Sequence, residues 1–224
     1  MTGIVHDENW IAELPVAVRE ALLARTTRRA VAAGETLKAA GGVPDAIYQV
    51  EAGYLKLMGL YPDGRNMLIE LYGAGNSFGE TAVIVHREGH FHSTVALVPT
   101  VVRRLARDDF WALYRTHPAI PEALSRKFAH KITRMFNSRE IRATLRLRSQ
   151  IASLLLNIAR RCGTEGSDGE LRFLLPISHT DIAEHLDVTR QAVQREVGVL
   201  RRAGLILQAD GGWIVLRPGD LARI

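Results

Sequence analysis

The period of the apolar residues changes near residue 107, and this change divides the chain into a β-rich part and a helical part. From about Val31 to Leu105, apolar residues alternate with their neighbours at period two, and glycines separate the alternating stretches. This spacing predicts an antiparallel β-barrel or β-roll, with Tyr61-Pro62-Asp63-Gly64 as one hairpin turn. The alternating residues are Tyr48 and Val50, Leu55 and Leu57, Met67, Ile69 and Leu71, and Val95 and Leu97.

Helices are expected on both sides of the β-rich region. Residues 7–29 are predicted to be helical, with Asp7 as the cap of a short first helix and Pro15 in the first turn of a second. Apolar residues three and four positions apart predict further helices after residue 107. The elements expected there are helices over 108–116, 119–145 and 146–162, a turn-rich loop over 162–170 and a short strand over 171–175.

The predicted helix over 119–145 carries one apolar stripe on an otherwise basic surface. Between Arg126 and Arg161 the chain has ten Lys or Arg residues and one acid, Glu140. Such a block either faces a polyanion or is a solvated helix surface. The stripe either packs into a core or forms a dimer interface, and we favour the interface because the opposite face is so basic. The residues expected in the interface are Leu124, Phe128, Ile132 and Met135.

Residues 177–206 have the pattern of a helix-turn-helix. Ser178 can cap the first helix, with Asp181 completing an approximate capping box, and Thr189 can cap the second. The second helix places long hydrogen-bonding side chains near its beginning, where a recognition helix enters the major groove of DNA. The alternative is a small helical bundle with exposed Arg and Gln side chains. The residues expected to bind DNA are Ser178, Thr189, Arg190, Gln191, Gln194 and Arg195.

The end of the chain predicts a wing after these two helices. Gly204 is expected to end the second helix in the left-handed conformation that glycine tolerates. Residues 207–215 then predict a hairpin with an Asp210-Gly211 turn. Helix, turn, helix and wing in this order favour a DNA-binding domain over a bundle.

Composition and motifs narrow the class of protein. The one cysteine, Cys162, excludes an intrachain disulfide, so we expect a cytoplasmic protein. No apolar run approaches the roughly 18–20 residues that span a bilayer, so no membrane partner is expected. The sequence lacks a P-loop, G-x-S-x-G and H-E-x-x-H, so we expect no enzyme. A subunit that binds a small molecule and acts only through protein contacts is a third possibility, which the wing and second helix disfavour.

These features together resemble the cyclic-AMP receptor protein and fumarate–nitrate regulator (Crp/Fnr) superfamily. Gly75-Asn76-Ser77-Phe78-Gly79-Glu80 is similar to its G-D-x-F-G-E turn, and Thr189–Arg195 is similar to its recognition helix, commonly S/T-R-E-T-V-S/G-R. The resemblance implies an α+β fold and a homodimeric, sequence-specific transcription regulator that binds palindromic double-stranded DNA and RNA polymerase. The expected domains are a β-roll of the cyclic-nucleotide-binding type over 1–118, a dimerisation helix over 119–145 and a winged helix-turn-helix over 146–224.

The resemblance also implies an effector pocket in the β-roll. In cyclic-AMP-binding members a Glu contacts the ribose, an Arg-Ser pair holds the cyclic phosphate, and a Thr-Ser pair on the long helix contacts the adenine. Here His92, after a two-residue insertion in Val85–His90, replaces the Arg, and Met135 and Phe136 replace the Thr-Ser pair. Imidazole does not offer the bidentate fork of guanidinium, so cyclic AMP is disfavoured. The expected pocket residues are Phe78, Gly79, Glu80, His92, Ser93, Met135 and Phe136.

Two other interpretations of the pocket stay open. His86, His90 and His92 could ligate haem, as in gas-sensing relatives, but we favour solvated loop histidines and expect no metal site, because the spacing fits no structural zinc motif. Some relatives need no effector, which the sequence does not exclude here.

Overall fold

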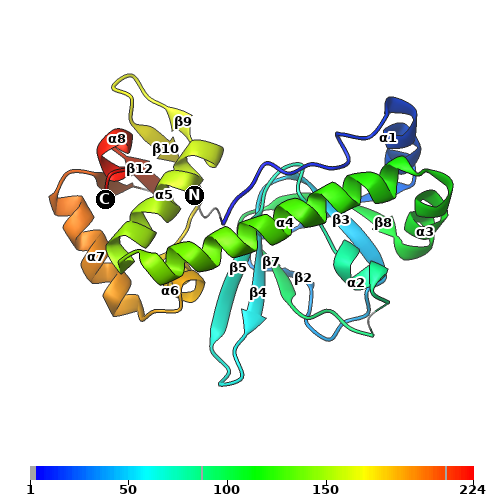
Figure 1. Ribbon diagram of the computed structural model, residues 1–224, viewed down its shortest axis with the longest axis horizontal. Coiled ribbons are helices and arrows are strands. Elements are labelled where there is room, and N and C mark those ends of the chain that lie inside the picture. Colours follow the sequence, from blue (N-terminus) through cyan, green and yellow to red (C-terminus); the bar gives the residue numbers. More distant parts are fainter. Residues whose placement is uncertain (1–3, 87, 210) are drawn as a thin grey trace. The chain divides into compact units, whose positions relative to one another are not determined.

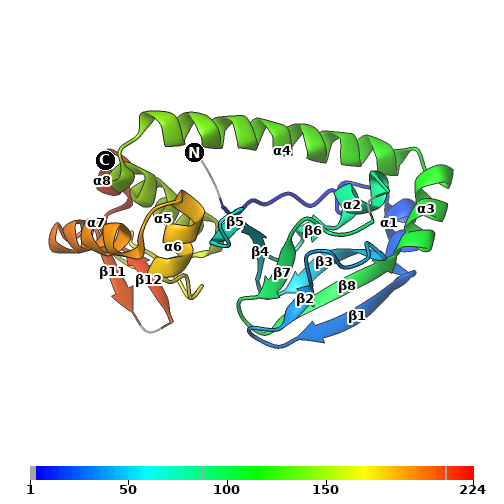
Figure 2. The ribbon, with the colours of Figure 1, turned by 90° about the horizontal axis from the view of Figure 1, so that it is seen from below.

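The computed structural model describes residues 4–86, 88–209 and 211–224. Its first part is an antiparallel β-roll of two four-stranded sheets, with strand orders β1-β8-β3-β6 and β2-β7-β4-β5 (Figures 1 and 2). This confirms the α+β prediction. The strands are β1 (Thr26–Val31), β2 (Thr36–Lys38), β3 (Ala46–Ala52), β4 (Leu55–Leu60), β5 (Asn66–Tyr72), β6 (Ser77–Phe78), β7 (Ser93–Ala96) and β8 (Thr100–Ala106).

The predicted hairpin turn joins β4 to β5. The Gly64 N–H donates to the Tyr61 carbonyl oxygen at 2.9 Å, and Gly64 adopts a φ of 83°, which glycine tolerates without strain. Period two also holds in β7, but its buried residues are Thr94 and Ala96 and not the apolar Val95. The interior of the roll is therefore more polar at β7 than its apolar residues indicate.

The prediction that residues 7–29 are helical is wrong at both ends. Trp10–Glu13 form a turn, and the carboxamide oxygen of Asn9, not Asp7, accepts the Ala12 N–H at 3.1 Å. Helix α1 spans Val16–Leu23 with Pro15 as its N-cap. Thr26–Arg29 belong to β1, where they pair with β8, because the sheet supplies hydrogen bonds and packing that outweigh local helix propensity.

One hydrophobic core lies between the sheet β1-β8-β3-β6 and the helices beside it. Helix α3 (Arg107–Thr116) and the beginning of α4 (Ala119–Thr144) bury Phe110, Leu113, Ile120 and Leu124 against Ile47 and Leu105. Figure 2 shows α4 running along the roll beside the short helix α2 (Glu80–Ile84). The first half of α4 is therefore part of the β-roll's own core.

The second part is a helical domain with a small sheet, which confirms the winged helix-turn-helix. Its sheet has the order β11-β12-β10-β9. The predicted strand over 171–175 is shorter than expected, and the expected loop contains β9. The elements are α5 (Leu147–Cys162), β9 (Thr164–Glu165), β10 (Leu171–Phe173), α6 (His179–Leu186), α7 (Arg190–Arg202), β11 (Ile206–Ala209), β12 (Gly212–Val215) and α8 (Pro218–Leu221).

The chain divides into two compact units inside α4. One unit contains His6–Gly64 and Glu70–Ile132, and Thr133–Ile224 with Arg65–Ile69 belong to the other. The expected domain bounds, 1–118, 119–145 and 146–224, stay predictions. Among the described residues, none of the helices combines the length and apolar content that crossing a bilayer requires.

Candidate nucleic-acid interface and the interior of the β-roll

The beginning of α6 is fixed by the predicted capping box. Ser178 Oγ accepts the Asp181 N–H at 3.1 Å, and the Asp181 carboxylate accepts the Ser178 N–H at 2.9 Å. Two backbone donors that the helix leaves unpaired are thus satisfied by local side chains. Ile182 and Ala183 are buried, so α6 packs against its own domain through the face that carries them.

Helix α7 separates buried apolar residues from exposed polar ones. Thr189 Oγ1 caps it by accepting the Ala192 N–H at 3.2 Å. Val193, Val197 and Leu200 are buried, so this face holds the helix on its domain. The four long polar side chains near its beginning, Arg190, Gln191, Gln194 and Arg195, are all exposed.

Glu196 forms a hydrogen bond with one of these arginines, Arg195. Its carboxylate accepts hydrogen bonds from Arg148 Nε at 2.9 Å and Arg195 Nε at 3.3 Å. Burial alone would raise the pKa of Glu196, but these hydrogen bonds lower it, so the carboxylate is ionised and orients both guanidinium groups. Sequence reasoning missed this pairing, because Arg148 lies on a different helix, 48 residues away.

The wing follows α7 as predicted. Ala203 is the C-cap and Gly204 adopts a φ of 63°. Strands β11 and β12 pair in antiparallel register from Ile206 opposite Val215 to Ala209 opposite Gly212. Asp210, which belongs to the predicted turn, lies outside the described residues.

Comparison with known proteins identifies both parts of the chain. Residues 28–117 match the model of the cyclic nucleotide-binding domain, and residues 149–224 match the model of the Crp-like helix-turn-helix domain. The chain belongs to the Crp/Fnr family of transcription regulators. Its helix-turn-helix is accordingly a DNA-binding domain.

Several Crp/Fnr regulators are similar over most of their length. A CRP-like cAMP-activated global transcriptional regulator of Mycobacterium tuberculosis is 27% identical over 85% of this chain and 84% of the relative. A global nitrogen regulator of Synechocystis is 26% identical over 74% of each chain. The crystal structure of a CRP-family transcriptional regulator from Thermus thermophilus has a TM-score of 0.71 and 26% identity, and the match covers 87% of this chain and 95% of that one. Regulators with different roles are therefore similar to this chain over most of its length.

Within this Crp/Fnr β-roll, Phe78 and Gly79 lie at the end of β6 and directly before α2. The Phe78 ring stacks between Tyr48 and Tyr72, with centroids 5.4 and 4.9 Å away. Gly79 has a φ of 101°, and a Cβ there would lie 2.9 Å from the Ala46 carbonyl oxygen. A side chain at this position is therefore excluded by both backbone conformation and space.

Glu80, the residue expected to contact an effector, is bound by the protein itself. Its Oε1 accepts hydrogen bonds from Lys127 Nζ at 2.7 Å and Trp10 Nε1 at 3.1 Å. Lys127 Nζ also donates to Ser77 Oγ and the Ser77 carbonyl oxygen, both at 2.8 Å. Burial of Glu80 would raise its pKa, but Lys127 and the hydrogen bonds lower it, so the pair is ionic. We call Trp10, Ser77, Glu80 and Lys127 the Glu80 network.

Sequence reasoning missed Lys127 and Trp10. Both come from segments distant from Glu80 in the chain, and Lys127 was counted only as one charge in the basic block of α4. Its position on the face that also carries Leu124, three residues earlier, is the one signal that could have placed it inside.

Two more of the predicted pocket residues, His92 and Ser93, lie directly before β7 and at its first position. Ser93 Oγ accepts the Ala40 N–H at 3.0 Å. The pKa of His92 is lowered by burial and by Lys38 and Lys131, so its ring is neutral at pH 7. Burial and Lys38 lower the pKa of His90 to about 4, although Asp45 acts in the opposite direction.

The histidine cluster that raised the haem interpretation is spread over different contacts. The His86 ring stacks on Trp111 with centroids 5.2 Å apart, and the backbone N–H of His90 donates to the Gly42 carbonyl oxygen at 2.9 Å. Arg87, in the inserted segment, lies outside the described residues. Over residues 4–86, 88–209 and 211–224, no three His, Cys, Asp or Glu side chains form a group suited to a metal ion.

Five residues of α4 were predicted to lie in the dimer interface or, for Met135 and Phe136, in the effector pocket. They fall into two groups by their exposure to solvent. Leu124 is 1% exposed, and Phe128 packs against the same core of the β-roll. Ile132 is 54% exposed, Met135 63% and Phe136 69%. Leu124 therefore has almost no surface left for a partner, whereas the second half of α4 presents three large apolar side chains to solvent.

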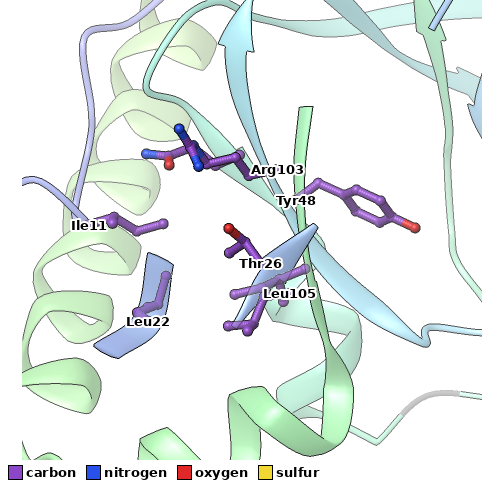
Figure 3. Close-up of a pocket in the computed structure, with 8 residues that line it drawn as sticks. Ile11, Leu22, Thr26, Tyr48, Arg103 and Leu105 are labelled. Atoms are coloured by element: carbon purple, nitrogen blue, oxygen red, sulfur yellow. The ribbon is translucent and has the colours of Figure 1, made fainter. Parts of the chain in front are cut away.

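A hollow near α1 is too small for an effector. It has a volume of about 10 Å³, enough for about one water molecule. Figure 3 shows Ile11, Leu22, Thr26 and Leu105 around it, while the Tyr48 ring points away from Ile11 and Leu22. None of the residues predicted to form the effector pocket lines this hollow.

Lys38 gives the β-roll a measurable dependence on pH. Burial lowers its pKa to about 8; Lys131 acts in the same direction and Glu80 opposes it. Because the unfolded chain keeps a pKa near 10.5, it binds more protons than the native chain between about pH 8 and 10.5, and this residue makes stability rise with pH there. We expect Lys38→Met to remove this rise and to stabilise the protein at pH 7.

Denaturant unfolding of the wild type, Lys38→Met and Lys56→Met at pH 7, 9 and 10 measures this effect. Lys56 lies on the outward face of β4 and controls for the loss of a lysine charge. Equal pH dependence in the wild type and Lys38→Met would contradict the prediction.

Proposed function

We propose that the protein is a homodimeric regulator that binds a palindromic DNA site through α7, and that an effector of its β-roll is not cyclic AMP. The observation that carries the DNA contact is the exposure of Arg190, Gln191, Gln194 and Arg195 on a helix whose apolar face is buried. RNA polymerase is the further partner we propose, on the basis of family membership.

The side chains of α7 determine which bases the protein reads. Arginine pairs bidentately with guanine O6 and N7, so Arg190 and Arg195 each specify a G, and Gln191 specifies an A. Glu196 supports this assignment for Arg195, because its hydrogen bond restricts the guanidinium group. Ser178 and Thr189 contact the DNA backbone from the N-termini of α6 and α7, where helices attract phosphate.

The homodimer forms through the second half of α4. Ile132, Met135 and Phe136 are large, apolar and exposed in the single chain, as expected of residues that a partner covers. Phe128 contributes at the edge of this surface. Leu124, which the sequence placed in the interface, is instead buried in the β-roll.

The Glu80 network is the reason to exclude cyclic AMP. A ribose contact requires the Glu80 carboxylate, which Lys127 and Trp10 already bind. The cyclic phosphate would meet a neutral His92 in place of a guanidinium fork. The contacts to the ribose and to the cyclic phosphate are therefore both weakened.

Selection of bound duplexes from a random pool tests the DNA function. We expect an inverted repeat with half-site centres about 34–36 Å apart, and an affinity that falls with salt. Arg195→Ala should cost roughly 1–3 kcal/mol on the selected site and little on random DNA. Arg201→Ala, an exposed arginine near the end of the same helix, is the matched control. Recovery of no inverted repeat, or an equal loss on both DNAs, would refute the assignment of α7.

A further inference from the structure

The beginning of α5 supplies a charged side chain to α7, the helix that we propose reads the DNA. The two helices pack against each other within one compact unit. Arg148 comes three residues before the fully buried Ile151, and Glu196 comes three residues after the fully buried Val193. Residues three or four positions apart share one face of a helix. Packing of α5 on α7 therefore brings the side chains of Arg148 and Glu196 together.

The Glu196 carboxylate joins Arg148 to Arg195 through its two oxygens. Oε2 accepts the hydrogen bond from Arg148 Nε at 2.9 Å, and Oε1 accepts the one from Arg195 Nε at 3.3 Å. The Glu196 side chain is 14% exposed, whereas that of Arg148 is 45% and that of Arg195 71% exposed. Arg195 is therefore the member of this group that a DNA duplex reaches most easily, and the other two residues lie behind it.

This arrangement leaves part of the Arg195 guanidinium available for a base. Among the described residues, the hydrogen bond that Arg195 donates uses Nε, so its two terminal nitrogens stay available for guanine O6 and N7. A carboxylate without a second cation would attract these nitrogens as well, because carboxylate and guanidinium pair bidentately. Arg148 binds the other carboxylate oxygen and so limits Glu196 to the Nε contact.

Glu196 is poorly placed to read a base itself. A glutamate in the major groove can accept a hydrogen bond from cytosine N4. Both oxygens of this carboxylate, however, already accept hydrogen bonds from arginines, and the side chain is mostly buried. Its contribution to sequence preference therefore has to pass through Arg195.

We propose that Arg148 determines base specificity without touching a base: through Glu196 it holds Arg195 with its terminal nitrogens free to read guanine. Arg148 and Glu196 are positioning residues in this arrangement, and Arg195 makes the contact. This inference rests on the proposed function, in which α7 reads DNA through Arg195. It adds the beginning of α5 to the elements that set the sequence preference.

Binding of the full chain to three duplexes at fixed salt tests this role. The duplexes are the selected operator, the same operator with adenine at the guanine whose preference Arg195→Ala removes, and a random sequence. We expect Arg148→Met to lower the discrimination between guanine and adenine about 3- to 10-fold, a part of what one bidentate pair supplies, because Glu196 then competes for the Arg195 guanidinium. Arg148→Lys keeps a cation beside Glu196 and should retain most of the discrimination.

Glu196→Gln gives a second test that leaves no uncompensated carboxylate between the helices. Its discrimination should fall as well, because Arg195 loses its ionic partner, whereas its affinity for the random duplex should rise, because an acid is removed beside a polyanion. Arg160→Met, in the last turn of α5, is the matched control and should leave discrimination unchanged. Thermal unfolding followed by circular dichroism checks that the variants are folded.

Three results would overturn the proposal. They are wild-type discrimination in Arg148→Met, wild-type discrimination in Glu196→Gln, and an equal loss on all three duplexes in Arg148→Met, which would make Arg148 a phosphate contact. Arg195→Ala in the same assay distinguishes failure of this inference from failure of the proposed function. If Arg195→Ala changes no base preference, α7 does not read DNA through Arg195; if it does and Arg148→Met does not, only the role of Arg148 is wrong.

Discussion

Replacing Lys127 with Met is expected to lower the free energy of unfolding of the β-roll by about 3–5 kcal/mol. The substitution leaves the buried Glu80 carboxylate without its cation, and removing one partner of a buried ion pair is far more costly than removing both. Denaturant unfolding, followed by circular dichroism, measures the loss. Glu80→Gln in the same chain should recover a large part of it, since the charge left behind is then gone.

The control for this prediction lies one residue earlier on α4. Arg126 is half-exposed and pairs with Glu122 at 2.7 Å and Glu13 at 3.6 Å on the surface. Exposed ion pairs contribute about 0–1 kcal/mol, so Arg126→Met should change stability little. Equal effects of Lys127→Met and Arg126→Met would show that the Glu80 network does not stabilise the roll.

The double substitution Met135→Glu with Phe136→Glu is expected to produce monomers and to weaken binding to a palindromic site by at least about 100-fold. Two like charges in the proposed interface would oppose association, and a monomer loses the avidity of two linked half-site contacts. Light scattering measures the oligomeric state and electrophoretic shift the affinity. Phe128→Glu is a poorer test, because Phe128 also packs against the core of its own β-roll.

Asn137→Glu provides the matched control on α4. Asn137 is exposed and follows Phe136 directly, so it tests whether added negative charge alone weakens binding to DNA. We expect this variant to stay dimeric with a smaller loss of affinity. A monomeric wild type at micromolar concentration, or a dimeric double variant, would contradict the proposed interface.

The helix-turn-helix could be predicted almost completely from the sequence. Its caps involve residues within three positions of each other, as Ser178 with Asp181 and Thr189 with Ala192. Local hydrogen bonds of this kind depend on residue type and spacing alone. The exposure of Arg190 and Arg195 follows from the same helical period that buries Val193 and Val197.

The interior of the β-roll could not be predicted in the same way. Lys127 and Glu80 are 47 residues apart, and no local pattern pairs them. Similarly, β7 buries Thr94 and exposes part of Val95, the reverse of what its apolar residue indicates. The apolar stripe on α4 was recognised, but only the folded chain shows that Leu124 faces its own core and Met135 faces solvent. Tertiary packing decides each of these positions.

Two of the three tryptophans lie where their fluorescence can report separately on the two compact units. Trp10 is buried with its indole N–H bound to Ser77 and Glu80, and Trp213 is buried with its indole N–H bound to the Ile177 carbonyl oxygen. Indole fluorescence depends on nearby charges and on water access. With Trp111 replaced by Phe, each compact unit would contain one internal chromophore. The chain thus carries natural optical labels for its two units, without any attached dye.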